Sequence, residues 1–456
     1  MRLYPILFFY LMAQLMSMGS FATTTPSDAE VIDATIRGTK PEPKRRAKPE
    51  PFDAIFPSTE YLGPVIGVAD TTPVYPLNHF FWKEFPTLKE HNIRLYGWVN
   101  PSYNTSSSIK SNFPLSYTLV PNHLELQQLT LRVERVPDTV QMSQVDWGFR
   151  VTNLYGVDYR YTTAAGVISN QLLSRNNLYG YDPIEAYGQL YFPAVAKGIV
   201  LTIGRFISPP DIESQLAPFN YLVTHSLIFS FEASTQTGVN AAIKLNDTWT
   251  VQLGILSSDD VAPWVKAAAL PTYQALVRWV SANNNDSLWG GVTSLNDGKF
   301  RGHHDNLQQV NLSWTHRFTE RFFTITEVYY LYQYDAAKGG TCIFGPIKSF
   351  GDGGGGCGPI IPGRSSALGA ANFVEYKLFE KNILSFRTDF LDDYEGQRTG
   401  FATPYMSWTL GLTHFFSSLV EVRPEVRYET AFHATPYDNG TRKNQAVFEI
   451  DAIVRF

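Results

Sequence analysis

The stretch Leu-Val-Glu-Val-Arg-Pro-Glu-Val-Arg-Tyr-Glu, residues 419–429, decides the class of this protein. Its even positions are apolar or aromatic (Val420, Val422, Pro424, Val426, Tyr428), and its odd positions are charged from Glu421 to Glu429. Successive side chains of a β-strand point to opposite faces, so this strand has one apolar and one charged face. Lipid outside and a watery lumen inside fit an outer-membrane barrel, whereas a soluble sandwich would pack the apolar face on a second sheet.

The last residues repeat this alternation and favour the barrel. Apolar side chains recur at Phe448, Ile450, Ala452, Val454 and Phe456, with charges between them at Glu449, Asp451 and Arg455. An aromatic residue at the end of the closing strand is typical of such barrels. The expected fold is therefore all-β, a single transmembrane antiparallel β-barrel.

Residues 1–22 have the layout of a secretory signal peptide. A single basic residue (Arg2) precedes an apolar stretch, and Ser20-Phe21-Ala22 supplies small residues for cleavage. We therefore expect export and a place in the bacterial outer membrane. No later stretch has the roughly 18 uninterrupted apolar residues of a membrane helix. Only helices and closed barrels satisfy the backbone hydrogen bonds within lipid, so strands must make the crossing.

Composition agrees with a barrel and argues against nucleic acid. Aromatic residues make up 14% of the chain, as 25 Tyr, 31 Phe and 9 Trp, which suits the aromatic girdles at two membrane interfaces. The formal net charge is -5, far from the basic balance of a nucleic-acid-binding protein. The expected surroundings are outer-membrane lipid and lipopolysaccharide.

The chain divides into four parts. After the signal peptide, residues 23–51 are rich in Pro and charge and read as a disordered periplasmic linker, whose basic run offers contact with anionic lipid or cell wall as an alternative. Residues 52–91 carry aromatic side chains that could pack, and we expect them at the periplasmic mouth, covering or partly plugging it. Residues 92–456 form the barrel.

Period-two runs predict sixteen strands. They cover residues 92–103, 122–135, 145–158, 182–192, 198–206, 235–245, 248–257, 272–281, 287–296, 307–317, 321–334, 367–379, 382–392, 404–416, 419–430 and 444–456. Connections after even-numbered strands are mostly tight and those after odd-numbered strands long, which is the rhythm of short periplasmic turns and long extracellular loops. Fourteen strands are the alternative, if the 272–296 hairpin lies outside the wall. Residues 224–231 resemble a strand, but an odd total excludes them, so 207–234 is expected to be one long loop. Pro424 cannot donate to a ladder and predicts a bulge or a locally broken bond.

The two cysteines, Cys342 and Cys357, lie in one Gly-rich stretch of an exported chain. Oxidation is favoured outside the cytoplasm, so we expect a disulfide within one loop, with two unpaired thiols as the alternative.

Several motifs, in their order along the chain, resemble one family. They are Leu95-Tyr96-Gly97-Trp98, Asp146-Trp147-Gly148-Phe149-Arg150, Tyr155-Gly156-Val157-Asp158, Gly204-Arg205-Phe206, Arg387-Thr388-Asp389-Phe390 and Arg423-Pro424-Glu425-Val426-Arg427-Tyr428. Together they resemble the OmpL-like "putative beta-barrel porin-2" family of outer-membrane proteins, over most of residues 92–456. The resemblance implies a single-chain barrel acting as a porin without a defined substrate. Relatives tend to have Gly-Tyr-Glu after the fifth strand, where this chain has Asp211-Ile212-Glu213.

A sixteen-stranded barrel encloses an aqueous bore, whose selectivity is set by its narrowest ring and the charges on it. The charged residues of inward parity are the pore-lining candidates: Arg150, Arg387, Asp389, Glu421, Arg423, Glu425, Arg427, Glu449 and Arg455. Cross-strand salt bridges that only solvate the wall are the alternative reading. Within the 207–234 loop, Asp211, Glu213 and His225 are the constriction candidates; packing at the surface is the alternative for that loop.

The expected function is passive diffusion of small hydrophilic solutes or ions, without enzymatic activity, cofactor or resident metal. His303-His304-Asp305 reads as a solvated loop tip, and no zinc-protease, phosphate-binding or nucleophile-elbow motif is present in the sequence. The alternative is a barrel with a closed lumen that acts as a surface-binding protein or a hydrolase. Porins of this size are often trimers, so a homotrimer is one expected assembly.

Overall fold

The computed structural model describes residues 66–68, 70, 72–114, 117–209, 212–302, 306–339 and 358–456. All of them belong to one compact unit, Arg45–Phe456. The predicted signal peptide and linker, the first part of the 52–91 segment, Asp211, His303-His304-Asp305 and both cysteines lie outside the described residues. The disulfide and the leader therefore remain predictions.

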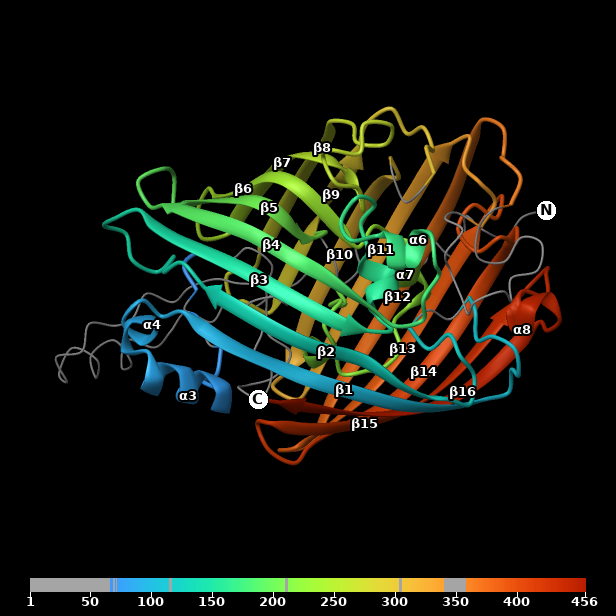
Figure 1. The fold of residues 1–456 in the computed structure, drawn as a ribbon, viewed down its shortest axis with the longest axis horizontal. Helices are drawn as coiled ribbons and strands as arrows, with labels where there is room; N and C mark the ends of the chain where they lie inside the picture. The colour runs from blue at the N-terminus through green and yellow to red at the C-terminus, as the bar shows by residue number, and fades with distance from the viewer. Residues whose placement is uncertain are drawn as a thin grey trace. The chain divides into compact units, whose positions relative to one another are not determined.

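Sixteen strands close into one antiparallel barrel, in which each strand pairs with its neighbours in sequence and β1 pairs with β16 (Figure 1). The strands are β1 (Arg94–Ser106), β2 (Leu124–Arg135), β3 (Asp146–Gly156), β4 (Gly180–Phe192), β5 (Ile199–Ile207), β6 (Thr235–Lys244), β7 (Trp249–Asp259), β8 (Thr272–Val280), β9 (Asp286–Leu295), β10 (Gln308–Thr319), β11 (Phe322–Tyr334), β12 (Arg364–Phe379), β13 (Asn382–Asp393), β14 (Thr403–Phe415), β15 (Val420–Ala431) and β16 (Asn444–Arg455). Short helices lie in the connections: α3 (Pro76–Glu84), α4 (Pro86–Glu90), α5 (Tyr159–Thr162), α6 (Asn170–Leu173), the 3-10 helix η1 (Ala217–Phe219), α7 (Leu227–Phe231) and α8 (Tyr437–Gly440).

The predicted strand count is confirmed. Residues 272–296 form β8 and β9 within the wall, so the fourteen-strand alternative is wrong. The soluble sandwich is wrong as well, because a single sheet closes on itself. Residues 224–231 lie in the connection between β5 and β6, and part of them forms α7.

Burial along the strands is inverted relative to a soluble protein. On β15, Val426 is 51% exposed whereas its neighbour Glu425 is 3% exposed. Lipid tails solvate the outer apolar side chains, so exposing them to the membrane carries no hydrophobic penalty. The charged side chains at alternating positions of each strand therefore point into the barrel.

The connections mostly alternate between short and long, as expected. Those after even-numbered strands span residues 136–145, 193–198, 245–248, 281–285, 320–321, 380–381 and 416–419. Those after odd-numbered strands span 107–123, 157–179, 208–234, 260–271, 296–307, 335–363, 394–402 and 432–443. By the rule for bacterial barrels the first set is periplasmic and the second extracellular.

Pro424 interrupts one ladder without changing its register. The pairing of β14 with β15 skips the positions of Pro424 and Arg423, and resumes at His414 and Val422 with the same offset. On its other side Pro424 faces Ile450 of β16 with no shift. Of the two predicted outcomes, the local break occurs and the bulge does not.

The barrel seam joins its first and last strands. The backbones of Gly97 and Phe456 exchange two hydrogen bonds, of 3.1 Å and 2.9 Å, and Trp98 faces Arg455. A Cβ on Gly97 would clash with the backbone carbonyl of Thr130 on β2 and would also come within 2.9 Å of the Phe456 ring, so this position requires glycine.

The described residues before β1 contact two separate parts of the barrel. Ile66 packs with Tyr191 of β4, and its carbonyl accepts a 3.0 Å hydrogen bond from Lys244 of β6. Further along, Tyr75 is buried with its ring 5.3 Å from that of Tyr96 on β1. None of the described helices combines the length and apolar character needed to cross a membrane.

Candidate functional site

The connection between β5 and β6, residues 208–234 and here called the inner loop, packs against the inner face of the barrel. Its apolar side chains, among them Leu216, Phe219, Leu222 and Leu227, are buried in the main hydrophobic cluster. The same cluster contains wall residues such as Phe373 of β12. Burial of apolar area stabilises by about 25 cal/mol per Å², which explains why this loop turns inward rather than into solvent.

Arginines of the wall hold the inner loop by its backbone carbonyls. Arg423 of β15 donates to the carbonyls of Ala217 (2.9 Å) and Asn220 (2.6 Å). Arg387 of β13 donates to the carbonyl of Thr224. Two further arginines do the same, Arg427 to the His225 carbonyl and Arg455 to the Pro218 carbonyl. Charge-assisted hydrogen bonds are roughly twice as strong as neutral ones, so the loop is fixed at several points.

Carboxylates of the same strands accept the loop's amide protons. Glu425 accepts from the backbone nitrogens of Val223 (2.7 Å) and Thr224 (3.2 Å), and from the Thr224 hydroxyl. Asp389 accepts from the backbone nitrogen of Leu227 at 3.2 Å. The alternating charges of β13 and β15 thus match the alternating donors and acceptors of a peptide backbone.

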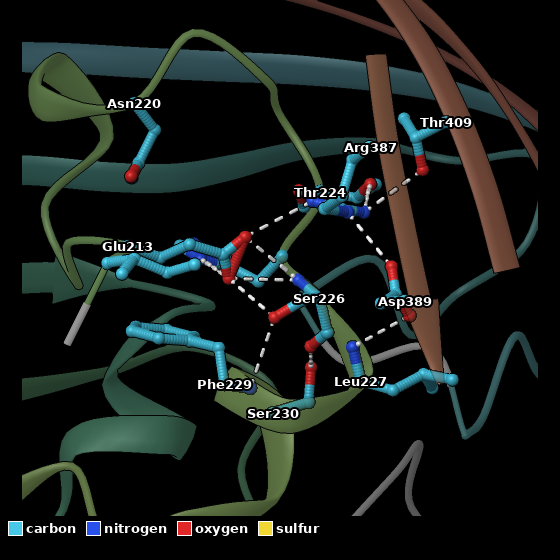
Figure 2. Close-up of polar contacts among 12 residues, drawn as sticks. Glu213, Asn220, Thr224, Ser226, Leu227, Phe229, Ser230, Arg387, Asp389 and Thr409 are labelled. Carbon is cyan, nitrogen blue, oxygen red and sulfur yellow. Dashed lines mark hydrogen bonds and ion pairs between the residues drawn. The ribbon is translucent and has the colours of Figure 1, made fainter. Parts of the chain in front are cut away.

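Glu213 organises the turn of the inner loop (Figure 2). Its carboxylate accepts from the Ser226 backbone nitrogen (2.9 Å) and hydroxyl (3.0 Å), and lies 3.2 Å from Arg387 Nη1. Ser226 in turn caps α7, because its hydroxyl accepts from the Phe229 nitrogen at 3.2 Å. Arg387 also bonds Asp389, at 3.0 Å between Nε and Oδ2. One buried arginine therefore links the loop's carboxylate to the wall's.

His225 lies beside this group in a nearly closed environment. Its ring stacks on Phe229 with 4.3 Å between centroids, and its Nδ1 lies 3.5 Å from Glu213. Burial lowers the pKa of His225, and the charge of Arg387 adds to that effect. Burial alone would raise the pKa of Glu213, but its bond to His225 and the charge of Arg387 outweigh this and lower it. The docked loop thus favours a neutral imidazole beside an ionised carboxylate.

Two wall glycines accommodate the loop's side chains. A Cβ on Gly369 of β12 would lie closer than 3.0 Å to Ile228, and one on Gly411 of β14 closer than 3.0 Å to Leu222. Neither glycine has a positive φ, so the requirement is space rather than backbone conformation. The wall is shaped to receive this loop.

Residues 92–456 match the model of one protein family, described as "Putative beta-barrel porin-2, OmpL-like". The chain is a member of that family. The resemblance inferred from the order of the motifs is thereby confirmed. The curated proteins contain no match.

Several solved structures are similar to this porin-2 family member. The anion-selective porin from Comamonas acidovorans has 9% identity and a TM-score of 0.48, over 80% of this chain and 99% of that one. The trimer form of OmpT from Vibrio cholerae has 10% identity and a TM-score of 0.45, over 80% and 99%. The outer membrane channel DcaP of Acinetobacter baumannii has 10% identity and a TM-score of 0.43, over 80% and 97%.

The pore-lining candidates divide by what they contact. Six of them, Arg387, Asp389, Arg423, Glu425, Arg427 and Arg455, bind the inner loop as described above. Glu421 pairs with Arg455 at 2.9 Å, and Glu449 accepts from the Thr118 hydroxyl in the 107–123 loop. Arg150 lies apart on β3, paired with Glu134 at 2.8 Å. Of the loop candidates, Glu213 and His225 lie together, and Asp211 is outside the described residues.

Sequence reasoning missed the uncharged partners of the inner loop. The side chain of Gln128 on β2 accepts from the Ala217 nitrogen (3.1 Å) and donates to the Gln215 carbonyl (2.8 Å). Thr413 of β14 donates to the Tyr221 carbonyl at 2.6 Å. Gln128 and Thr413 both stand at positions whose side chains point into the barrel, and this alternation is the one signal for them in the sequence. Only charged residues at such positions were considered in the sequence analysis, so these two were not included.

A small cavity lies beside the inner loop on the side of β11 and β12. Its volume is about 30 Å³, and it is lined by Glu213, Thr224, His225, Ile325 and Glu375 among others. That is room for about one or two water molecules. All nine pore-lining candidates are 8% exposed or less. Across the residues that the structure describes, no group of three or more His, Cys, Asp or Glu side chains could hold a metal ion.

Proposed function

We propose that this family member is a diffusion porin with a narrow, polar passage that admits water, ions and the smallest hydrophilic solutes. The observation that carries the proposal is the inner loop, whose backbone is held across the lumen by Arg387, Arg423 and Glu425. A loop fixed in this way sets the bore of the channel, because it occupies lumen that side chains alone would leave open. The protein needs no catalytic step for this role.

The wall formed by β6, β7 and β8 supports a polar route. Along β6, β7 and β8, the inward side chains Asn240, Gln252 and Gln274 are amides that hydrogen-bond to one another. Amides supply donors and acceptors without fixed charge, which suits neutral solutes and hydrated ions alike. The passage is proposed to run between this amide wall and the inner loop.

Conductance measurements test the proposal. Protein inserted in planar bilayers should give small, uniform current steps, and liposomes containing it should swell in monosaccharides faster than in trisaccharides. Heat-denatured protein at the same dose is the control. Purified barrels that produced neither steps nor swelling would refute the diffusion porin.

A second candidate is a barrel that is closed at rest and binds at the cell surface, and the deep burial of the nine candidates favours it. An Arg387→Met variant separates the two. In a porin both proteins conduct and the variant conducts more, since its loop is held less firmly. In a closed barrel only the variant conducts.

Three further features belong to this proposal. The signal peptide expected in residues 1–22 would direct the chain to the outer membrane, and residues 66–90 would cover part of the periplasmic mouth, supported by the contacts of Ile66 and Tyr75. A homotrimer is proposed as the assembly. Light scattering of the detergent-solubilised protein, corrected for bound detergent, measures its mass and tests the trimer.

A further inference from the structure

The outer face of the barrel carries a patch of tyrosines where β11 ends. Tyr330, Tyr332 and Tyr334 are the outward positions there, since the residues between them are buried inside the barrel. The centroids of successive rings lie 6.1 Å and 6.0 Å apart. This end of β11 leads into the 335–363 connection, which belongs to the extracellular set. Aromatic side chains gather at the level of the lipid headgroups, so the patch marks the outer boundary of the membrane.

Arg364, the first residue of β12, lies on this patch. Its guanidinium carbon is 4.4 Å from the centre of the Tyr332 ring and 5.5 Å from that of Tyr330. Its Nη2 donates a 2.9 Å hydrogen bond to the Tyr330 hydroxyl. The next residue, Ser365, is buried inside the barrel, so Arg364 stands on the outer face. Stacking on the two rings therefore holds a cation against the outside of the wall, at the level of the headgroups.

No carboxylate pairs with Arg364 within the part of the chain that the structure describes. The acidic residues of the adjoining connections accept backbone hydrogen bonds instead, Asp335 from the Gly363 nitrogen at 3.0 Å and Glu395 from the Ser366 nitrogen at 2.8 Å. Of the five N–H donors of an arginine, Tyr330 receives one, and the other donors of Arg364 bond no described residue. The guanidinium thus keeps a fork of donors for an oxyanion from outside the chain.

A second cation stands beside Arg364. Tyr334 pairs with Arg364 on one side and forms a β-bridge with Lys299 of the 296–307 connection on the other. Adjacent strands are about 4.8 Å apart, so the backbones of Arg364 and Lys299 lie roughly 10 Å apart. Lys299 is exposed, and Asp297, two residues before it, is paired with Arg301 at 2.6 Å. Two phosphates of one headgroup can span two cations at this separation.

We propose that Arg364 and Lys299, together with the tyrosines of β11, bind the phosphorylated headgroup of a lipopolysaccharide molecule in the outer leaflet. The extracellular position of the patch selects the outer leaflet, and the pairing of two cations with two phosphates supplies the charge complementarity. Arginine matches a phosphate with two parallel N–H donors, and a tyrosine ring beside it can contact the acyl chains below. The inference goes beyond the diffusion function, because the site lies on the outside of the wall and needs no open passage.

Native mass spectrometry of the full chain in detergent measures this binding, with bisphosphorylated lipid A, the lipid part of lipopolysaccharide, as the probe. In the double variant Arg364→Gln, Lys299→Gln the dissociation constant should rise roughly 30-fold, the equivalent of about 2 kcal/mol, since each cation near an anionic lipid surface contributes about half of that. The control is Arg135→Gln, at the periplasmic end of β2, whose arginine is paired with Asp146 at 2.9 Å. It should bind lipid A as the unmodified protein does. Heat-modifiable migration shows that the barrel of each variant has formed.

Two further probes identify the group that is recognised. Lipid A without its phosphates should bind the unmodified protein about as weakly as intact lipid A binds the double variant. Inorganic phosphate at millimolar concentration should not displace the intact lipid. Equal affinity for the two lipids, an unchanged affinity in the double variant, or displacement by phosphate alone would overturn the inference. None of these measurements involves conduction, so the diffusion porin stands or falls separately.

Discussion

Adding one methyl group to the barrel wall should loosen the inner loop. In Gly369→Ala the new Cβ would lie closer than 3.0 Å to Ile228 and 3.0 Å from the ring of Tyr329. Overpacking of this kind costs about 1–3 kcal/mol. Because 1.4 kcal/mol corresponds to tenfold, the docked loop should open roughly 5 to 150 times more often.

Hydrogen exchange measures that opening directly. The amide protons of Val223, Thr224 and Leu227 are bonded to wall carboxylates, so they exchange only when the loop leaves the wall. Their exchange in Gly369→Ala should accelerate by the same factor. The control is Gly188→Ala on β4, where no atom lies within 4 Å of the added Cβ.

A compensating change tests whether the contact itself is responsible. Ile228→Ala loosens the loop by loss of buried surface, but it also removes the clash with the methyl group added at position 369. The double variant should therefore exchange no faster than Ile228→Ala alone, a coupling of about 0.5–3 kcal/mol. Equal exchange in Gly369→Ala and Gly188→Ala, or strictly additive effects in the double variant, would refute the docking of Ile228 on this glycine.

Three further predictions concern residues that hold the inner loop or the segment before β1 to the barrel. Arg387→Met should weaken docking of the inner loop by about 3–5 kcal/mol, because it leaves buried carboxylates without their cation. Faster exchange of the loop amides should show this. The control variant Arg301→Met, at an exposed ion pair, should cost at most about 1 kcal/mol. Acid should also release the loop, because burial lowers the pKa of His225 and its partners lower the pKa of Glu213. Docking is therefore strongest above about pH 6.5 and declines below it. Exchange of the loop amides, corrected for its intrinsic rate, should rise at pH 5.5, and this rise should be smaller in His225→Gln. Tyr75→Ala should cost about 3–5 kcal/mol of buried aromatic packing, and trypsin should then cut residues 72–90 faster while the barrel stays intact; unchanged cleavage would contradict the proposed cover of the mouth.

The strands could be predicted because lipid and lumen impose opposite demands on neighbouring side chains. Val426 and Glu425 are typical: the apolar side chain lies on the outer face of the strand and the charged side chain is buried inside the barrel. The largest discrepancy at a strand start is at β12, which begins at Arg364 rather than at residue 367. Its first residues, Arg-Ser-Ser, carry no apolar alternation, so pairing with β11 rather than hydrophobicity sets that boundary.

The inner loop could be predicted as a segment but not as a docked structure. Its length and apolar residues suggested an inward fold, and parity placed Arg387 and Glu425 on the lumen face. The alternation of side chains does not show whether an inward charge contacts water or protein. In this structure Arg387 and Glu425 bind the backbone of the inner loop, more than 160 positions away in sequence, and such long-range contacts cannot be predicted from the sequence around either residue.

Gly369 is a second case in which the sequence does not identify the contact. A glycine within an alternating strand predicts either a weaker strand or another group packed close to its backbone, but the sequence does not show which group that is. The structure supplies Ile228 as that group.

The seam between β1 and β16 constrains the order of assembly. Asn100 and Asp451, which bond across it, are separated by 351 positions, so the cylinder cannot be sealed until nearly all of the barrel-forming sequence has been delivered. Until then the two edge strands of the open sheet expose unpaired backbone N–H and C=O groups, which could pair with another strand. Closure of the barrel therefore requires the C-terminal strand, whose last residue, Phe456, packs its ring against Gly97 of the first strand.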